Sequence, residues 1–301
     1  METTEKIWLN GKIIDWDDAK IHVLTHALHY SSGVFEGVRF YATPKGPAVF
    51  RLEEHTKRLF YSAGVLEMEL PYSAEGINKA VTDLIRINKI KSGYIRPIAY
   101  YSYGRMGLNP SGIPVDVCVA IWPWGKYLGK DAVQVKTSKY IRIHPKSVIS
   151  DAKICGYYIN SILASLEVKR AGYDEALLLD YQGNVAEGPG ENIFWIKNGK
   201  LFTVPPGSIL LGITRDSVKT LARDMGMQVE ETQITLDKLK KADEVFFTGT
   251  AAEITGVGQI DDTLIGDGHL GKITAGLRDR YLKIVGGQDE KYAHWLSYVN
   301  S

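Results

Sequence analysis

The sequence predicts a mixed α/β protein of the α+β type, divided into two domains. At 301 residues the chain is longer than one typical domain, so two domains that share a cleft are expected. Short runs rich in β-branched and aromatic residues alternate with segments whose apolar residues recur at helical spacing. We place an N-terminal domain at residues 1–125, a linker at 126–134 and a C-terminal domain at 135–301.

The first half begins with a predicted hairpin at residues 7–14, because Asn10-Gly11 accepts the positive φ angles of a type I′ turn. The following elements are predicted in chain order: an apolar run over 34–41 leading to a second at 49–50, helices over 52–66 and 77–85, and strands over 94–101 and 115–122.

The second half begins with a predicted strand at 133–137. A helix follows Lys153, with Ile159, Ile162, Leu163 and Leu166 on one face and Gly172 as its C-terminal cap. The remaining predictions are a strand at 175–181, a hairpin at 193–204 around Asn198-Gly199, a helix at 214–225 with Thr214 as N-cap and Gly226 as its stop, a short strand at 245–249 and a helix at 273–285.

The amino-acid composition limits the classes of function that the chain can have. The hydrophobic fraction is 45%, the charged fraction 24% and the formal net charge +1, so nothing in the charge favours a nucleic acid or an anionic membrane as partner. The N-terminus lacks signal-peptide features and no apolar run approaches a membrane span, which makes the cytoplasm the expected location. Cys118 and Cys155 form no CxxC pair and are expected to be buried free thiols.

Two motifs match known patterns in their residue types but not in their structural context. Gly266-Asp-Gly-His-Leu-Gly271 fits the glycine pattern of dinucleotide sites, but no βαβ unit surrounds it, so we interpret it as a tight turn. His26 and His29 lack further ligands for a metal, and we expect them to be packed or hydrogen-bonded. No metal is therefore predicted.

Two turns favour an anion such as phosphate. Leu211-Gly-Ile-Thr-Arg215 begins a predicted helix, where free backbone N–H groups and the positive end of the helix dipole lie. Thr248-Gly-Thr-Ala-Ala252 is a second small-residue turn at a strand end. Each alone is explained by an ordinary capped helix or turn, but two in one domain shift the interpretation toward a phosphate ligand.

Lys153 and Glu187 have the chemistry that pyridoxal phosphate needs from a protein. A lysine can form a Schiff base with the cofactor, and a carboxylate can hold the protonated pyridine nitrogen of a ring that acts as electron sink. No spacing rule derives that assignment, because a lone lysine before a helix is usually a solvated charge.

The chain resembles the branched-chain amino acid aminotransferases, members of the fold type IV group of pyridoxal-phosphate enzymes. The resemblance covers nearly the whole chain. Its motifs are His26-Ala-Leu-His-Tyr30, Gly33-Val-Phe-Glu-Gly-Val-Arg39, Tyr94-Ile-Arg-Pro97, Trp122-Pro-Trp-Gly-Lys-Tyr127, Glu187-Gly-Pro-Gly-Glu-Asn192, Leu211-Gly-Ile-Thr-Arg215 and Gly249-Thr-Ala-Ala-Glu253. The second-half motifs belong to the wider fold group and identify the cofactor, whereas the first-half motifs indicate branched-chain substrates.

The resemblance implies a small N-terminal α/β domain, a larger C-terminal pseudo-barrel domain and pyridoxal 5′-phosphate as cofactor. It implies that Lys153 is the Schiff-base lysine and moves the substrate proton, that Glu187 faces the pyridine nitrogen, and that Tyr158 bonds the ring hydroxyl. The implied phosphate ligands are Arg58, Ile213, Thr214 and Thr250.

The resemblance also implies a site that serves two kinds of substrate. Leucine, isoleucine and valine need apolar walls, whereas glutamate and 2-oxoglutarate bring a second carboxylate, for which Arg96 is the expected partner. The expected walls are Tyr30, Phe35, Tyr94 and Trp124, and the Thr250-Ala251 turn is expected to bind the α-carboxylate. In the family the loop at Leu108 reaches the neighbouring subunit's site, which implies a homo-oligomer of at least two chains and leaves dimer or hexamer open.

Other members of the fold group remain alternatives: D-amino acid transaminases, R-selective amine transaminases and aminodeoxychorismate lyase. A non-catalytic protein that binds a phosphate ligand is the alternative from another class. The chain departs from the relatives at Ile154-Cys-Gly-Tyr157, where small residues are common, and this bulk leaves the substrate range open.

Overall fold

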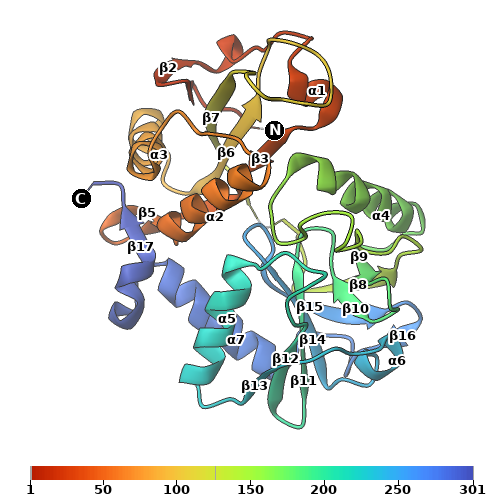
Figure 1. Ribbon diagram of the computed structural model, residues 1–301. Helices are drawn as coiled ribbons and strands as arrows, with labels where there is room; N and C mark the ends of the chain where they lie inside the picture. The colour runs from red at the N-terminus through yellow and green to blue at the C-terminus, as the bar shows by residue number, and fades with distance from the viewer. Residues whose placement is uncertain (1, 126, 301) are drawn as a thin grey trace. The chain divides into compact units, whose positions relative to one another are not determined.

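A computed structural model describes residues 2–125 and 127–300 (Figure 1). Its contacts divide the chain into two compact units. Unit 1 comprises Met1–Gly125, Ala152–Gly156 and Lys283–Ser301, and unit 2 comprises Lys126–Asp151 and Tyr157–Leu282. No helix among the described residues is long and apolar enough to cross a membrane.

Two segments that the sequence prediction assigned to the C-terminal domain lie in unit 1 instead. Residues 152–156 join it because Ile154 bridges to Val34 and the Lys153 backbone N–H donates to Ser62 Oγ at 2.8 Å. The chain end joins it because β17 (Leu296–Tyr298) pairs antiparallel with β5 (Gly46–Phe50). Both links are long-range pairings, which local sequence patterns do not reveal.

The predicted linker at 126–134 also differs from the structure. Lys126 lies outside the described residues, and β8 (Ala132–Thr137) already begins within the predicted range. β8 pairs with β15 (Glu253–Ile260) through Ala132 opposite Gly256, so this part of the segment belongs to the sheet of unit 2.

Unit 1 is built on an eight-stranded sheet with the order β17-β5-β4-β6-β7-β1-β2, and β3 pairs with β6 beside this path. Its other strands are β1 (Lys6–Leu9), β2 (Lys12–Asp15), β3 (Gly33–Phe35), β4 (Val38–Thr43), β6 (Gly93–Tyr101) and β7 (Val115–Trp122). The predicted N-terminal hairpin is confirmed: Asn10 and Gly11 both have positive φ, 48° and 81°, between β1 and β2.

The apolar run predicted as one strand at 34–41 is two strands, β3 and β4, separated by Glu36 and Gly37. The Glu36 backbone N–H donates to the Pro97 carbonyl at 2.8 Å, so the chain stays attached to β6 across the interruption. A Cβ on Gly37 would lie 1.8 Å from the Tyr94 hydroxyl, and the backbone therefore passes this ring only as glycine.

The helices of unit 1 are α1 (His26–Tyr30), α2 (Leu52–Val65) and α3 (Ala74–Asn88), with 3₁₀ turns η1 (Trp16–Asp18) and η3 (Glu290–Trp295). α2 and α3 pack on each other; α2 also contacts β3, and α3 contacts β1 and β7. Leu59 of α2 and Ile77, Leu84 and Ile85 of α3 are fully buried, as the helical spacing predicted.

Unit 2 contains a barrel. The strand order β10-β9-β8-β15-β14-β11 closes on itself because β10 pairs with β11 as well as with β9, which confirms the predicted pseudo-barrel. The ring is extended by β12 and β13 beyond β11 and by β16 beside β15. The remaining strand bounds are β9 (Glu175–Leu179), β10 (Val185–Glu187), β11 (Asn192–Lys197), β12 (Lys200–Thr203), β13 (Val229–Glu231), β14 (Glu244–Gly249) and β16 (Thr263–Leu264).

Apolar side chains from these strands form one buried cluster. Val133, Leu177, Ile193, Val245 and Val257, each from a different strand of the ring, belong to it. Side chains on neighbouring positions point to the other face, where the Phe194 and Phe246 rings stack with centroids 5.1 Å apart. Because the cluster fixes the strands, the strand ends at the rim of the barrel are held in register.

Helices and short turns complete unit 2. The helices are α4 (Tyr158–Arg170), α5 (Ile213–Asp224), α6 (Leu236–Leu239) and most of α7 (Lys272–Val285), and η2 (Cys155–Tyr157) precedes α4. α4 contacts β8 and β9, and α5 contacts β14. Gly266 and Gly268 have positive φ, 57° and 83°, ahead of α7, as the interpretation of this motif as a tight turn requires.

The apolar face predicted for α4 exists but is not the buried one. Ile159 and Ile162 are 58% and 51% exposed, and Leu163 and Leu166 are exposed with them. The side chains that pack against the sheet are the smaller Ala164 and Val168. Apolar spacing marks a face of a helix but does not say what covers it.

The start of α5 differs from the prediction by two residues. The N-cap is Gly212, which makes no side-chain cap hydrogen bond, and Thr214 lies inside the first turn. The Gly212 N–H donates to Asn192 Oδ1 at 3.1 Å, and a Cβ on Gly212 would lie 2.1 Å from that oxygen. The contact with Asn192 therefore sets where the helix begins. Gly226, with φ 79°, ends it as predicted.

Candidate active site

The predicted site residues fall into two groups, one in each unit. Unit 1 carries Tyr30, Phe35, Arg58, Tyr94, Arg96, Leu108, Trp124 and Lys153. Unit 2 carries Tyr158, Glu187, Ile213, Thr214, Thr250 and Ala251.

Lys153 is held by unit 1 through its backbone. Its N–H donates to Ser62 Oγ, and its carbonyl accepts from the Phe35 N–H at 3.2 Å. The Nζ atom lies 4.9 Å from the centroid of the Phe35 ring. Desolvation and the Arg58 guanidinium lower the pKa of Lys153 to about 8, with Glu36 opposing the shift. A substantial fraction of this amine is therefore neutral near physiological pH.

Arg58 belongs to a buried charged cluster that the sequence interpretation did not include. The Glu36 carboxylate accepts from Arg58 Nε at 2.6 Å and from Arg58 NH2 at 2.9 Å. It also hydrogen-bonds to His55 Nδ1 at 2.7 Å. His55 and Arg58 are three residues apart on α2, so both reach Glu36 from one face of the helix.

Aromatic rings surround the Arg96 guanidinium. Its Cζ lies 4.7 Å from the Phe35 centroid, 5.6 Å from Tyr94 and 5.9 Å from Trp122. Trp124 packs edge-on against Tyr94 with centroids 4.6 Å apart. Arg96 Nε is buried without a hydrogen-bond partner in the part of the chain described. The structure thus brings together Phe35, Tyr94, Trp124 and an arginine that can still bind an anion.

Tyr30 and Leu108 line another pocket of unit 1. They share a pocket of about 880 Å³ with His26, Tyr101 and Pro110. Among the described residues that line this pocket, neither Lys153 nor Arg96 is found. Leu108 is 85% exposed. The described lining of this pocket does not include Phe35, Tyr94 or Trp124.

Glu187 lies at the rim of the barrel, where β10 meets β11. Its carboxylate accepts from Arg142 Nε at 2.6 Å, from Asn192 Nδ2 at 3.0 Å and from the Leu210 N–H at 3.2 Å. Asn192 faces Glu187 directly in the β10–β11 register. Arg142 NH1 is buried with no partner among the described residues. Both carboxylate oxygens are thus fixed by neighbours from separate segments.

The predicted phosphate residues of unit 2 lie at two chain turns. Ile213 and Thr214 are the first residues of α5, a helix whose N-terminus has no side-chain cap. Thr250 and Ala251 lie in the turn from β14 to β15, directly after Gly249. Thr248, near the end of β14, has a buried hydroxyl without a partner in the described chain. These are donors of the kind that an anion accepts from.

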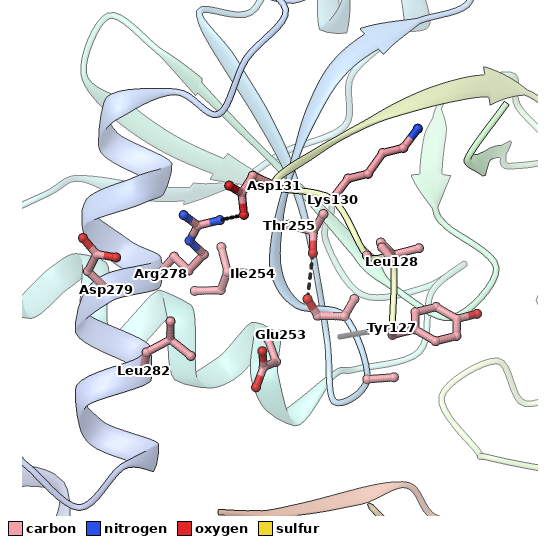
Figure 2. A pocket seen from close by; sticks show the side chains of 13 residues that line it. Tyr127, Leu128, Lys130, Asp131, Glu253, Ile254, Thr255, Arg278, Asp279 and Leu282 are labelled. Atoms are coloured by element: carbon pink, nitrogen blue, oxygen red, sulfur yellow. Dashed lines mark hydrogen bonds and ion pairs between the residues drawn. The ribbon is translucent and has the colours of Figure 1, made fainter. Parts of the chain in front are cut away.

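A pocket of about 160 Å³ lies beside the β14–β15 turn (Figure 2). Figure 2 shows Arg278 pointing to Asp131, with NH1 and Oδ1 2.9 Å apart. The other cation that lines it, Lys130, is paired with Asp174 at 2.6 Å. Both cations that line this pocket are thus already paired.

Tyr158 is the first residue of α4 and is half-buried.

The interpretation of the histidines is confirmed, since His26 hydrogen-bonds to Ser32 Oγ at 2.6 Å and to the Gly107 carbonyl at 2.7 Å. Both cysteines are free thiols as predicted, although each is half-buried rather than fully buried. Burial raises the pKa of Cys118 to about 11. No group of potential metal ligands occurs among the described residues.

Comparison with known proteins identifies the family. A model of class IV amino-transferases matches residues 33–260. A branched-chain-amino-acid aminotransferase of Pseudomonas aeruginosa is 47% identical over 297 residues, with 97% of each chain covered. That of Escherichia coli strain K12 is 42% identical, with 99% of each covered. This chain belongs to the branched-chain-amino-acid aminotransferases of class IV.

Solved structures agree with this assignment. A T.th. branched-chain amino acid aminotransferase complexed with N-(5′-phosphopyridoxyl)-L-glutamate has a TM-score of 0.97 and 46% identity, with both chains fully covered. The enzyme of Thermobaculum terrenum in its PLP form has a TM-score of 0.93 and 35% identity, with 99% of each chain covered. The other fold type IV activities are not favoured by these relatives.

The residues of this chain fit a pyridoxal-phosphate site. Lys153 is a lysine that burial makes partly neutral, and Glu187 is a fixed carboxylate. Thr248 and the uncapped α5 N-terminus offer donors, and Arg142 NH1 is a buried donor still to be satisfied. A cofactor with a basic ring nitrogen and a phosphate uses groups of each of these kinds.

Sequence reasoning missed the partners of the charged residues. Glu36 could have been found, because a carboxylate inside an apolar strand-like run must be paired when it is buried. Arg142 lies in an irregular segment 45 residues before Glu187 and carries no local signal.

Proposed function

We propose that the chain transfers the amino group of L-leucine, L-isoleucine or L-valine to 2-oxoglutarate, giving the branched-chain 2-oxo acid and L-glutamate. The family supports this reaction and pyridoxal 5′-phosphate as its cofactor. When bound, the cofactor supplies a ring that withdraws the electron pair of the substrate's Cα–H bond. The observation that carries the proposal is Lys153, a desolvated lysine with its pKa lowered to about 8.

Lys153 attaches the cofactor and acts as the general base. A neutral Nζ is required for both roles, because a protonated amine has no lone pair. The pKa of about 8 supplies that form. The Phe35 ring, 4.9 Å from Nζ, keeps water from one side of the amine.

Glu187 binds the protonated ring nitrogen. Its hydrogen bonds from Arg142, Asn192 and the Leu210 N–H fix the direction of the carboxylate. An ionised carboxylate keeps a ring nitrogen protonated, which raises the ring's ability to accept electrons. Tyr158, at the start of α4, is assigned to the ring hydroxyl.

The phosphate is bound by the backbone N–H groups of Ile213 and Thr214, by Thr250 and by Arg58. The uncapped N-terminus of α5 supports the first two, since its free N–H groups and dipole attract a dianion. Thr250 is placed by the β14–β15 turn. Arg58 adds a charge-assisted contact from α2.

Phe35, Tyr94 and Trp124 form apolar walls for the branched side chain, and Arg96 binds the distal carboxylate of glutamate. The packing of these rings supports the walls. The unpartnered Arg96 Nε supports the second role, because a carboxylate would satisfy it. The turn at Thr250 and Ala251 offers main-chain donors to the α-carboxylate that all substrates share.

The active protein is a homo-oligomer, at least a dimer, and acts in the cytoplasm. Two observations support self-association. Leu108 and Tyr30 are exposed and line a pocket whose described lining does not include Lys153. The exposed apolar face of α4, with Ile159, Ile162 and Leu166, is of the kind that a second copy covers.

A transamination panel tests the proposal. L-leucine, L-isoleucine and L-valine should each react with 2-oxoglutarate, and D-alanine and a primary R-amine should not. Following the two half-reactions separately also distinguishes a lyase, which needs no second amino acceptor. Activity on D-alanine without activity on the branched L-substrates would contradict the proposal.

A further inference from the structure

Glu36 is a fully buried carboxylate to which the proposed chemistry assigns no task. It lies at the break between β3 and β4, with its backbone N–H bound to the Pro97 carbonyl. The preceding residue, Phe35, is bonded through its own N–H to the Lys153 carbonyl, and its ring faces Lys153 Nζ. Glu36 thus stands next to the strand segment that holds the Schiff-base lysine.

The charge of Glu36 is fixed by its partners. Burial disfavours the charged carboxylate, but Arg58 and His55 outweigh it and hold the pKa of Glu36 well below its usual value. Desolvation lowers the pKa of His55, so the imidazole is neutral at physiological pH and its Nδ1–H donates to Glu36. The cluster is one carboxylate and one guanidinium, with no net charge.

The geometry of the ion pair fixes the Arg58 side chain. Nε and NH2 form one edge of the guanidinium, and both donate to Glu36, at 2.6 Å and 2.9 Å. A bidentate pair of this type defines the plane of the guanidinium as well as its position. Without the carboxylate, the Arg58 side chain regains rotamers that its place on α2 allows.

We propose that Glu36 is a positioning residue for the reaction: it fixes Arg58 for its proposed contact with the cofactor phosphate, and it keeps a compensating negative charge next to Phe35, whose backbone N–H and ring contact Lys153. This inference rests on the proposed function for the roles of Arg58 and Lys153. The loss of the Glu36 charge should lower the pKa of the Lys153 amine. Arg58 disfavours the protonated Lys153 amine and Glu36 favours it, so removal of the carboxylate leaves the guanidinium uncompensated.

The test separates the charge from the geometry. Glu36→Gln removes the charge and keeps the size, and Glu36→Asp keeps the charge but is too short for the same bidentate contact. The reaction of Lys153 with a small amine-reactive reagent is followed by peptide mass spectrometry as a function of pH, in the full chain without pyridoxal phosphate. The pH at which this reactivity is half-maximal is the Lys153 midpoint. Equilibrium binding of pyridoxal phosphate is measured separately.

In Glu36→Gln the Lys153 midpoint should fall by about one pH unit, so that reactivity at pH 7 rises about fivefold. In Glu36→Asp the midpoint should stay near that of the parent, while cofactor binding weakens about tenfold as Arg58 loses its orientation. Glu54→Gln is the matched control: Glu54 pairs with Arg51 at 2.5 Å on the same helix and should change neither quantity.

A buried charge without its partner can prevent folding, so a second pair of variants accompanies the first. Arg58→Met should raise the Lys153 midpoint, and adding Glu36→Gln to it should bring the midpoint back down without leaving an unpaired charge. Lys153 midpoints that do not move in Glu36→Gln or between these two variants would overturn the inference. Because reactivity is read without cofactor, it is independent of the proposed function, which instead fails if the parent shows no transamination.

Discussion

Both units contain a buried glutamate paired with an arginine, but the two carboxylates are held in different ways. In unit 1, Glu36 accepts from His55 and Arg58, which both belong to α2. In unit 2, Glu187 accepts from Arg142, Asn192 and the Leu210 N–H, which come from three separate segments around the barrel rim. The O–N distance to the arginine Nε is 2.6 Å in each pair.

The two carboxylates are therefore suited to different tasks. Glu36, at the break between β3 and β4, and Arg58 of α2 form an ion pair without net charge, which we propose limits the effect of the guanidinium on Lys153. Glu187 is fixed from several sides, and we propose it as the acceptor for the cofactor ring. In the proposed function, Lys153 and Arg96 of unit 1 serve proton transfer and substrate fit, whereas Glu187 of unit 2 sets the electronic state of the cofactor.

The largest effect is expected at Lys153. Lys153→Ala should lower transamination by about 10³-fold or more, because both the covalent attachment and the base are lost. Steady-state turnover with leucine and 2-oxoglutarate measures it. Lys146→Ala, in the exposed part of the same irregular segment, is the control. If the turnover of Lys153→Ala stayed within about tenfold of that of the parent, Lys153 of unit 1 would not be the residue that transfers the proton.

Glu187→Gln should lower turnover by about 10²-fold while the protein still binds pyridoxal phosphate, because an amide does not stabilise a protonated ring nitrogen. Turnover and cofactor titration are compared on the same preparation. Glu230→Gln, an exposed residue of β13, is the control. If the variant lost cofactor binding but kept its turnover per bound cofactor, Glu187 would be a structural residue only.

Arg96→Ala sharpens the role of unit 1 in substrate fit. The value of kcat/KM should fall about 30-fold more with glutamate than with leucine, because only glutamate brings a distal carboxylate. This factor corresponds to about 2 kcal/mol of lost transition-state stabilisation. Comparison of kcat/KM for the two amino donors measures this difference. Arg105→Ala, on an exposed loop, should affect both donors equally. Equal losses in Arg96→Ala would show that Arg96 serves the shared α-carboxylate or the fold.

Features set by local sequence were predicted from the sequence alone. The Asn10-Gly11 hairpin depends on the backbone freedom of those two residues, and the end of α5 depends on Gly226. The pseudo-barrel, the cofactor and the substrate class came from resemblance to a family. They involve pairings such as β10 with β11 and groups such as Lys153 that no local pattern brings together.

Features set by long-range contacts were not predicted. Residues 152–156 join unit 1 through Val34 and Ser62, both far earlier in the chain. α5 begins at Ile213 because its cap, Gly212, must approach Asn192. The exposed face of α4 has the same apolar spacing as a buried one, so its environment is a property of the fold.

The central claim is that Lys153 is the residue that binds pyridoxal phosphate. The most direct measurement is borohydride reduction of the protein with its cofactor, followed by proteolysis and peptide mass spectrometry. We expect one phosphopyridoxyl adduct, on the peptide that contains Lys153, and none in Lys153→Ala. An adduct on another lysine, or no adduct in a protein that catalyses transamination, would contradict the account.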